Sequence, residues 1–279
     1  MDLADLLACP VCRAPLAPDP QEIRCGGCAR VWPQADPRVV DLLVESGSAS
    51  RRRAWQRQQR EMIDQYRDLV DDREHARLAF RSDFDPLAPA LEALRGRVID
   101  VGGGQGLVRH WLPEPQGYAV VDPETGWLDQ PWELLADAFP CLERAPAFVR
   151  GVAERLPLRA ECADAVLSIF NLNHLIEPAR GLAEMIRVLR PGGRLVLVLD
   201  DLPPRWSDLA PDGSYPCRDA RERRRLRGRW LLTRFTGHRV AHDHVPIRER
   251  RLRAWTRALE LRDRRWRGAY LCLVYSKPG

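Results

Sequence analysis

Residues 97–112, RVIDVGGGQGLVRHWL, decide the fold of this chain. A β-branched apolar run ends at Asp100, glycines follow at positions 102, 103, 104 and 106, and the apolar spacing after them predicts an amphipathic helix. Glycines at 102 and 104 let the backbone approach a ligand without a Cβ in the way. A dinucleotide-binding fingerprint would place a third glycine where Leu107 stands, so this turn departs from that fingerprint.

The next strand brings an acidic residue to the same place. YAVVDPE (118–124) is an apolar strand that ends in Asp122, 22 residues after Asp100. A carboxylate at the tip of the second strand can accept hydrogen bonds from both hydroxyls of a ribose. The alternative is an acid that only starts the turn before Pro123.

Strands and helices go on alternating after Asp122. AFVRGVAERLPLRAECADAVLSIFNLNHL (147–175) predicts two further strands, and EPARGLAEMIRVLRPGGRLVLVLDD (177–201) predicts a helix, a Pro-Gly-Gly turn and a buried parallel strand. A helix over 248–260 and an antiparallel strand pair that turns near Arg267 and Gly268 close the chain. This order predicts an α/β fold with a doubly wound, mainly parallel sheet, whose ligands lie at the carboxyl ends of the strands.

The spacing D-x-G-x-G-x-G from Asp100 resembles motif I of class I S-adenosylmethionine (SAM) methyltransferases. The segment after 150 resembles the ubiquinone-biosynthesis-like members, in which G-D-A-E-x-L-P-F precedes a strand, and LRPGG (189–193) matches their entry to strand five. Val152 replaces the acid that contacts the adenine amino group there. The resemblance spans Val98 to Asp200 and implies a seven-stranded Rossmann-like sheet with SAM as cofactor.

The resemblance also implies a set of cofactor-binding residues along the carboxyl ends of the strands. The backbone of Val152 and Ala153 stays available to the edge of the base. The full set is Asp100, Gly102, Gly103, Gly104, Gln105, Gly106, Asp122, Pro123, Val152, Ala153, Glu154, Ser168 and Phe170.

A metal site precedes this sheet. Cys9, Cys12, Cys25 and Cys28 form the pattern C-x2-C-x12-C-x2-C, which is typical of a tetrahedral zinc site in a reducing compartment. About 45 residues cannot bury enough apolar surface to fold alone, and a bound Zn²⁺ would supply the missing stability. Closed four-cysteine sites are structural, so the pattern indicates metal binding and no activity of its own.

Residues 3–44 resemble the Trm112-like zinc ribbons, small methyltransferase activators in which CPxC and CxxC knuckles precede a proline-bearing strand. The resemblance implies a module that accompanies a methyltransferase. We therefore expect a zinc ribbon over residues 1–45, a linker and helical cap over 46–95, and a methyltransferase domain over 96–279 with an insertion at about 201–247.

Three residues are candidates for catalysis. The helix predicted after ESGSAS (45–50) puts Trp55, Met62, Tyr66 and Leu69 on one stripe, and Tyr66 either lies near the transferred methyl group or is an ordinary core residue. His242 and His244 alternate in the insertion, so one of them could be a general base. Alternatively, His242 and His244 are both polar residues of a surface strand. For His174 we expect a packing role beside the cofactor and no role in proton transfer.

The composition excludes several classes of protein. The 279 residues contain 45% hydrophobic and 30% charged residues, with no apolar run long enough to span a membrane and no basic segment ahead of the first apolar stretch. We therefore expect a cytoplasmic chain that is not secreted. We also expect a monomer or a homodimer.

Of 44 basic residues only Lys277 is a lysine. The arginines concentrate in 218–229 and 248–267, and these stretches are either solvated helices or a face that binds an anionic partner.

Methyl transfer from a sulfonium mostly requires alignment of the acceptor and exclusion of water. We expect a SAM-dependent methyltransferase acting on a heteroatom of a small molecule in natural-product or cofactor biosynthesis. The first alternative is an RNA or translation-factor methyltransferase that uses the zinc ribbon and the arginine clusters. The second is a SAM-binding scaffold without catalysis, against which the intact glycine turn and Asp122 count.

Overall fold

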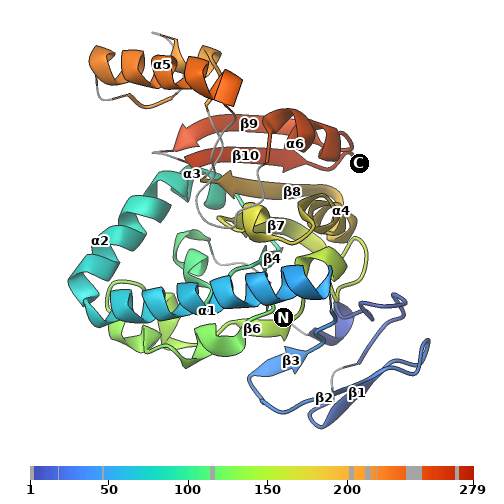
Figure 1. Cartoon of the computed structure of the whole chain (residues 1–279). Helices are drawn as coiled ribbons and strands as arrows, with labels where there is room; N and C mark the ends of the chain where they lie inside the picture. The colour runs from blue at the N-terminus through green and yellow to red at the C-terminus, as the bar shows by residue number, and fades with distance from the viewer. Residues whose placement is uncertain are drawn as a thin grey trace.

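The computed structural model describes residues 3–17, 19–45, 47–113, 117–200, 204–210, 215–217, 219–236, 247–267 and 270–279. Its centre is an eight-stranded sheet in the order β3-β6-β5-β4-β7-β8-β10-β9 (Figure 1). The six strands from β3 to β8 pair in parallel, whereas β10 pairs antiparallel with β8 and with β9. The predicted doubly wound, mainly parallel sheet is confirmed, and β3 joins it as an eighth strand. The strands are β3 (Val39–Asp41), β4 (Arg97–Val101), β5 (Gly117–Asp122), β6 (Ala147–Arg150), β7 (Ala163–Ile169), β8 (Leu189–Leu199), β9 (Glu260–Arg267) and β10 (Tyr270–Ser276).

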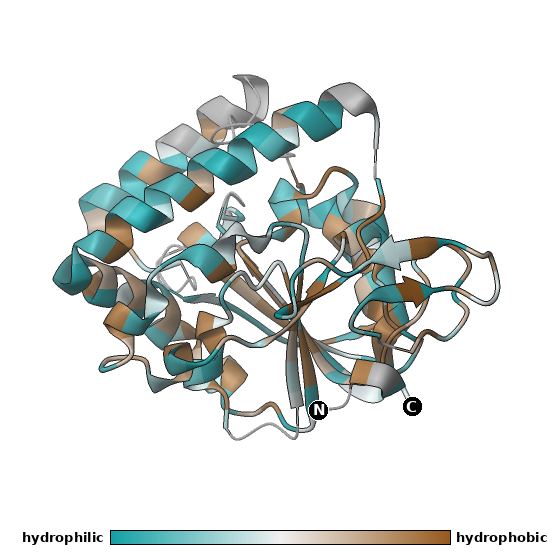
Figure 2. Cartoon of the chain, turned by 90° about the horizontal axis from the view of Figure 1, so that it is seen from below, coloured by the Kyte–Doolittle hydropathy of each residue, from teal (hydrophilic) through white to brown (hydrophobic). Residues whose placement is uncertain are grey.

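Alternate residues of the central strands pack into two separate apolar clusters, one on each face of the sheet. Ile99 and Val101 of β4 belong to one cluster and Val98 to the other. The strands form the apolar centre of the molecule (Figure 2). Burial on both faces explains why β4 and β5 are almost continuously apolar in sequence.

Six α-helices are described beside the sheet. α4 and α6 contribute to the first cluster, and α1, α2 and α3 contribute to the second. Ser48 caps α1, because its side chain accepts a hydrogen bond from the backbone N–H of Arg51. The helices are α1 (Ala49–Asp71), α2 (Arg73–Phe84), α3 (Ala88–Leu91), α4 (Pro178–Val188), α5 (Ala220–Thr236) and α6 (Glu249–Trp255).

We expected an amphipathic α-helix after the glycine turn, and this prediction is wrong. Residues Leu107–Trp111 form only a short 3₁₀ helix, which ends two residues before Pro113. The connections from β5 to β6 are likewise short 3₁₀ segments, at Thr125–Asp129, Trp132–Leu135 and Pro140–Glu143. This face of the sheet is covered by these short segments together with the helices that precede β4.

The amino-terminal segment is continuous with the rest of the molecule. Strands β1 (Glu22–Arg24) and β2 (Val31–Pro33) form a small antiparallel hairpin, and β3 then pairs in parallel with β6 at the edge of the central sheet. Leu6, Leu7 and Trp32 are buried in the same cluster as α4 and one face of the sheet. The segment with the four cysteines thus shares its core with the sheet.

The carboxyl-terminal half matches the predicted order. A helix, a Pro-Gly-Gly segment and a buried strand occupy 178–199, with Gly192 at φ +76°, and the final antiparallel pair is β9 and β10. The helix expected over 248–260 is shorter, since α6 ends at Trp255. Among the described residues, no helix is both long and apolar enough to cross a membrane.

Candidate functional site

The glycine turn follows β4 and is held in a conformation that requires glycine. Gly102, Gly104 and Gly106 have φ angles of +74°, +52° and +73°, in the left-handed region. A Cβ on Gly102 would collide with the side chain of Asn171, whose Nδ2 donates to the carbonyl of Val101 at 3.0 Å. The turn therefore presents bare backbone to the space above the strand ends.

Asp122 ends β5 beside this turn. Its carboxylate accepts hydrogen bonds from the backbone N–H of Gly104 at 3.2 Å and of Glu124 at 2.9 Å. The side chain is buried, and this burial raises the pKa of Asp122 to about 7. A ligand whose hydroxyl groups donate hydrogen bonds to the Asp122 carboxylate would favour the ionised form of Asp122.

Asp100 lies at the other side of the turn. Burial raises its pKa to about 6, although the hydroxyl of Tyr118 donates a hydrogen bond to its Oδ2 at 2.5 Å. Arg109 lies over the ring of Tyr118, at 5.7 Å from the centroid. The Asp100 carboxylate thus holds the base of the turn to β5.

The larger of two neighbouring cavities opens beside Asp122. It has a volume of about 240 Å³ and is lined by the ends of β4 and β5, the loop after β6, the segment after β3 and the first half of α1. Four predicted residues after Asp122 line it as well: Pro123, Val152, Ala153 and Glu154. The Glu154 carboxylate accepts a hydrogen bond from the backbone N–H of Glu177 at 3.1 Å, so it also holds the loop in place.

The second cavity lies over the glycine turn and has a volume of about 100 Å³. Gly102 is in the lining of both cavities, so both spaces border the glycine turn. The walls of the second cavity are mostly aromatic and apolar. They comprise Met62, Tyr66, Phe80, Phe84, Asp100, Gly102, Gly103, Gly104, Gln105, Leu107, Val108, Trp127, Ile169 and Phe170.

Tyr66 reaches this second cavity from α1. Its ring packs at 5.3 Å from Trp127 and 6.1 Å from Phe80, measured between centroids. Burial, with Asp83 and Asp200 nearby, raises the pKa of Tyr66 to about 12. The phenol is therefore protonated at neutral pH, and it can donate a hydrogen bond but cannot act as a base.

Other predicted residues lie elsewhere. Ser168 is fully buried within β7 and lines neither cavity, so the structure does not bring it to the predicted cofactor site. Gly106 begins the 3₁₀ helix after the turn and lines neither cavity. His242 and His244 lie outside the described residues. His174 has its Nδ1 at 3.3 Å from Nε2 of Gln58, which lies on α1.

Residues that the sequence analysis did not name as site residues also line the larger cavity. They come from the segment after β3 and from α1, which lies in front of the sheet in Figure 1. The expected helical cap over 46–95, with Trp55 on its stripe, pointed to α1, whereas nothing in the sequence marked the segment after β3. These residues are Leu43, Val44, Glu45, Arg52, Trp55, Gln56 and Gln59.

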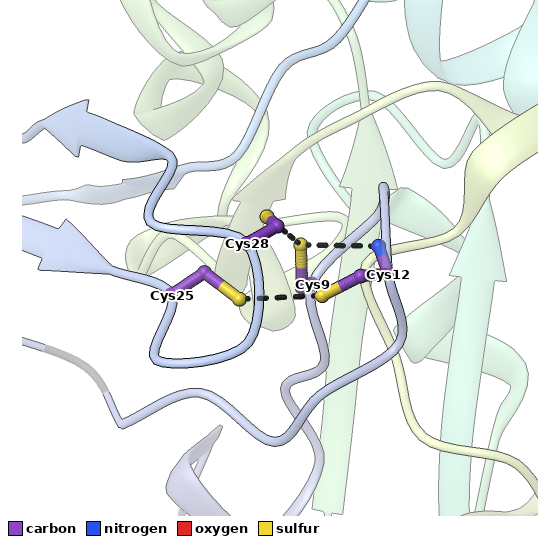
Figure 3. Close-up of side chains that lie close together, drawn as sticks. All are labelled: Cys9, Cys12, Cys25 and Cys28. Atoms are coloured by element: carbon purple, nitrogen blue, oxygen red, sulfur yellow. Dashed lines mark hydrogen bonds between the residues drawn. The ribbon is translucent and has the colours of Figure 1, made fainter.

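The four amino-terminal cysteines meet in space, and their ligand atoms all lie within 4.8 Å of one another (Figure 3). Sγ of Cys12 is 3.4 Å from Sγ of Cys25, and Sγ of Cys9 is 3.7 Å from Sγ of Cys28. A tetrahedral zinc with bonds of about 2.3 Å places its sulfurs about 3.8 Å apart. The cluster therefore fits a four-cysteine zinc site.

Backbone amides surround these sulfurs in the way that metal-bound thiolates require. The N–H groups of Val11 and Cys12 point at Sγ of Cys9 at 3.4 Å, and that of Gly27 points at Sγ of Cys25 at 3.3 Å. Among the described residues, these cysteines are the one group of three or more potential ligands that could hold a metal ion.

Residues 99–197 match the family model described as a methyltransferase domain. An uncharacterised methyltransferase of Mycobacterium tuberculosis is 41% identical over 110 residues, which cover 39% of this chain and 41% of that protein. A demethylmenaquinone methyltransferase of Beutenbergia cavernae is 48% identical over 121 residues, covering 42% and 46%. The chain spans about half or less of the length of these relatives. The stretch that matches the methyltransferase model contains the glycine turn, Asp122 and the carboxyl ends of β4 to β7.

Two solved structures resemble the fold. A SAM-dependent methyltransferase from Aquifex aeolicus has 18% identity and a TM-score of 0.44, covering 70% of this chain and 90% of that one. A complex of the Haloferax volcanii Trm112 methyltransferase activator with a methyltransferase has 13% identity and a TM-score of 0.48, covering 78% and 98%.

Proposed function

We propose that the whole chain is a SAM-dependent methyltransferase, built around the methyltransferase domain that residues 99–197 form. The observation that carries the proposal is the pair of cavities that share Gly102 in their lining, with the buried Asp122 carboxylate in the lining of one and the glycine turn in the lining of the other. The base and ribose of the nucleoside would lie in the larger cavity, and its amino-acid end would cross the turn.

We assign each group of lining residues a role in binding the cofactor or in excluding water. Asp122 accepts hydrogen bonds from the ribose hydroxyls, and the backbone of Val152 and Ala153 faces the base. The aromatic walls around Tyr66 and Phe170 exclude water from the reacting end. When bound, SAM supplies a methyl group already activated on a sulfonium, so these residues need only orient the reactants.

We propose a small apolar molecule as the acceptor, used in the biosynthesis of a cofactor or natural product. Aromatic rings from α1, α2 and the segment after β7 border the second cavity, which suits an apolar acceptor approaching from that side. Relatives named demethylmenaquinone methyltransferases support this class. The transfer would break the methyl carbon–sulfur bond, form a bond from that carbon to the acceptor heteroatom and release the acceptor proton.

One observation favours the alternative of an RNA or translation-factor acceptor. α5 carries seven arginines and one acidic residue, and Arg221, Arg224 and Arg225 are exposed on it. Binding to bulk tRNA that weakens steeply with added salt would support this alternative, and its absence at low salt would exclude it. A scaffold without catalysis is the remaining alternative.

The test of the main proposal is calorimetric titration of the zinc-loaded chain with S-adenosylhomocysteine. We expect saturable binding with one site, and loss of it in Asp122→Ala. A chain that binds neither SAM nor its demethylated product would contradict the proposal. Formation of S-adenosylhomocysteine with any acceptor would then exclude the scaffold alternative.

A further inference from the structure

We propose that the metal-binding segment forms part of the wall of the cofactor cavity, so that zinc and the nucleoside strengthen each other's binding. The inference rests on the proposed function, because it takes the larger cavity as the place of the nucleoside. It assigns a role in nucleoside binding to Leu43, Val44 and Glu45, and a positioning role to Trp32 and Arg13.

One wall of the cavity is the direct continuation of β3. Leu43, Val44 and Glu45 follow that strand and line the cavity. The strand is held to β6, because the backbone N–H of Leu42 donates to the carbonyl of Arg150 at 3.0 Å and the Arg150 guanidinium pairs with Asp41 at 2.9 Å. Arg150 also donates to the carbonyl of Pro123 at 3.1 Å, beside the proposed ribose site.

The hairpin that carries two of the cysteines fixes the position of this wall. The indole Nε1 of Trp32 in β2 donates to the carbonyl of Leu43 at 3.3 Å. The side chain of Gln34 spans the same two segments, donating to the carbonyls of Trp32 at 2.9 Å and Asp41 at 3.0 Å and accepting from the N–H of Asp41 at 2.8 Å. A metal that holds the turn between β1 and β2 therefore also holds the cavity wall.

The first cysteine knuckle contacts the chain that follows another part of the wall. Ala153 lines the cavity, and the chain then runs on to Leu156 and Pro157. The backbone N–H of Ala8 donates to the carbonyl of Pro157 at 3.0 Å, and Nη1 of Arg13 donates to the carbonyl of Leu156 at 2.9 Å. The four cysteines thus join the segment after β3 to the segment after Ala153, and both segments contribute residues to the lining of one cavity.

This arrangement has a thermodynamic consequence. If the metal orders both walls, the metal-loaded chain binds the nucleoside more tightly, and linkage requires that the nucleoside tighten the metal by the same factor. A coupling of about tenfold lies within the usual range for two linked sites. A metal that only stabilised a separate ribbon would leave both affinities unchanged.

The first experiment measures zinc instead of activity. The affinity of the full chain for zinc is measured at equilibrium by competition with a chromogenic chelator, with and without saturating S-adenosylhomocysteine. We expect the dissociation constant of zinc to fall about tenfold with the nucleoside in the native chain. In Asp122→Ala, which should not bind the nucleoside, we expect no change. Equal zinc dissociation constants in the native chain, under conditions where calorimetry shows the nucleoside bound, would overturn the inference.

The second experiment tests the path through Trp32. Trp32→Phe keeps an apolar ring but removes the hydrogen bond to Leu43, and we expect the dissociation constant of S-adenosylhomocysteine to rise about fivefold while the zinc content stays at one per chain. Arg24→Ala, an exposed position on the same hairpin, should bind as the native chain does. An unchanged dissociation constant in Trp32→Phe would contradict the role of Trp32.

Failure of the proposed function and failure of the coupling give different experimental results. If the native chain binds no nucleoside, the proposed function fails. If it binds the nucleoside, but the nucleoside does not tighten zinc binding and Trp32→Phe binds the nucleoside normally, only the coupling fails.

Discussion

The carboxyl group of Asp122 is buried at the end of β5 and accepts two backbone hydrogen bonds. Burial raises its pKa from the ordinary 3.8 to about 7, so near neutral pH both its forms are populated. Since the ribose hydroxyls bind best to the ionised carboxylate, we expect nucleoside affinity to rise between pH 6 and pH 8, by at most about tenfold per pH unit. Calorimetry across this range is the measurement, and Asp122→Asn, which has no charge to lose, should bind weakly with no such slope.

The same raised pKa affects stability without any ligand. Between the unfolded value of 3.8 and about 7, the folded chain binds more protons at Asp122 than the unfolded chain does. The contribution of this group to stability therefore falls as the pH rises through that window. We expect the native chain to lose stability from pH 5 to pH 7 by more than Asp122→Asn does, as measured by urea unfolding. Parallel curves for the two chains would contradict the raised pKa.

His242 and His244 remain predicted as candidates for a general base, and both lie outside the described residues. We expect His242→Ala or His244→Ala to lower turnover about 100-fold if that residue takes the acceptor proton, while the affinity for S-adenosylhomocysteine stays unchanged. The comparison requires single-turnover rates and calorimetry on the same preparations. Native rates in both variants would remove the two histidines from the mechanism.

At the residue scale, the glycine turn and Asp122 could be predicted because strand ends of a parallel sheet meet at one edge. The expected helical cap over 46–95, with Trp55 on its stripe, indicated that α1 would lie near the pocket, but Leu43 could not be predicted, because its place at the cavity depends on how β3 packs at the edge of the sheet. Ser168 is fully buried and lines neither cavity, which the sequence pattern alone does not indicate.

The elements after β8 are joined by a buried network of charges. Arg264 of β9 makes two hydrogen bonds to Asp208, at 2.7 and 2.8 Å, and contacts Glu249 of α6 at 3.0 Å. The Arg264 and Asp208 side chains are 13% and 6% exposed. Burial opposes the ionisation of Asp208, but the hydrogen bonds from Arg264 prevail and lower its pKa to about 2. The network therefore connects the segment after β8 to α6 and β9.

We expect Arg264→Ala to lower the free energy of unfolding by about 3 kcal/mol, because it removes the most buried cation of the network and leaves Asp208 and Glu249 with their contacts to Arg205 and Arg253. Urea denaturation followed by circular dichroism measures the change. Arg265→Ala, at the next position on β9 where the side chain is 64% exposed, should change stability by less than about 1 kcal/mol. Similar losses in both variants would show that the network contributes little.

Among the elements, the strands were predicted better than the helices beside them. The central strands β4, β5 and β7 are short apolar runs with clear ends, whereas the residues after the glycine turn have helical spacing but form only one 3₁₀ segment before Pro113. The helices α1 and α2, within the expected helical cap, pack on the same face beside that segment.

The whole molecule has no separate core for its metal-binding segment. Leu6, Leu7 and Trp32 belong to the apolar cluster that also contains the sheet and α4. We therefore expect the zinc-loaded chain to unfold in one calorimetric transition and Cys25→Ser to lower the temperature of that transition as a whole. Two separate transitions in the loaded chain, of which only the first responds to Cys25→Ser, would contradict a shared core.

The pairing of β3 with β6 joins residues that are far apart in sequence, as the contact between Asp41 and Arg150 across 109 positions shows. A ribosome releases the cysteines and β3 long before β6 exists, at about 5–20 residues per second. For several seconds the nascent chain therefore has a complete set of metal ligands and an unpaired edge strand. We expect early capture of zinc to keep that strand from pairing with another nascent chain, so that cells starved of zinc would accumulate this protein as aggregate.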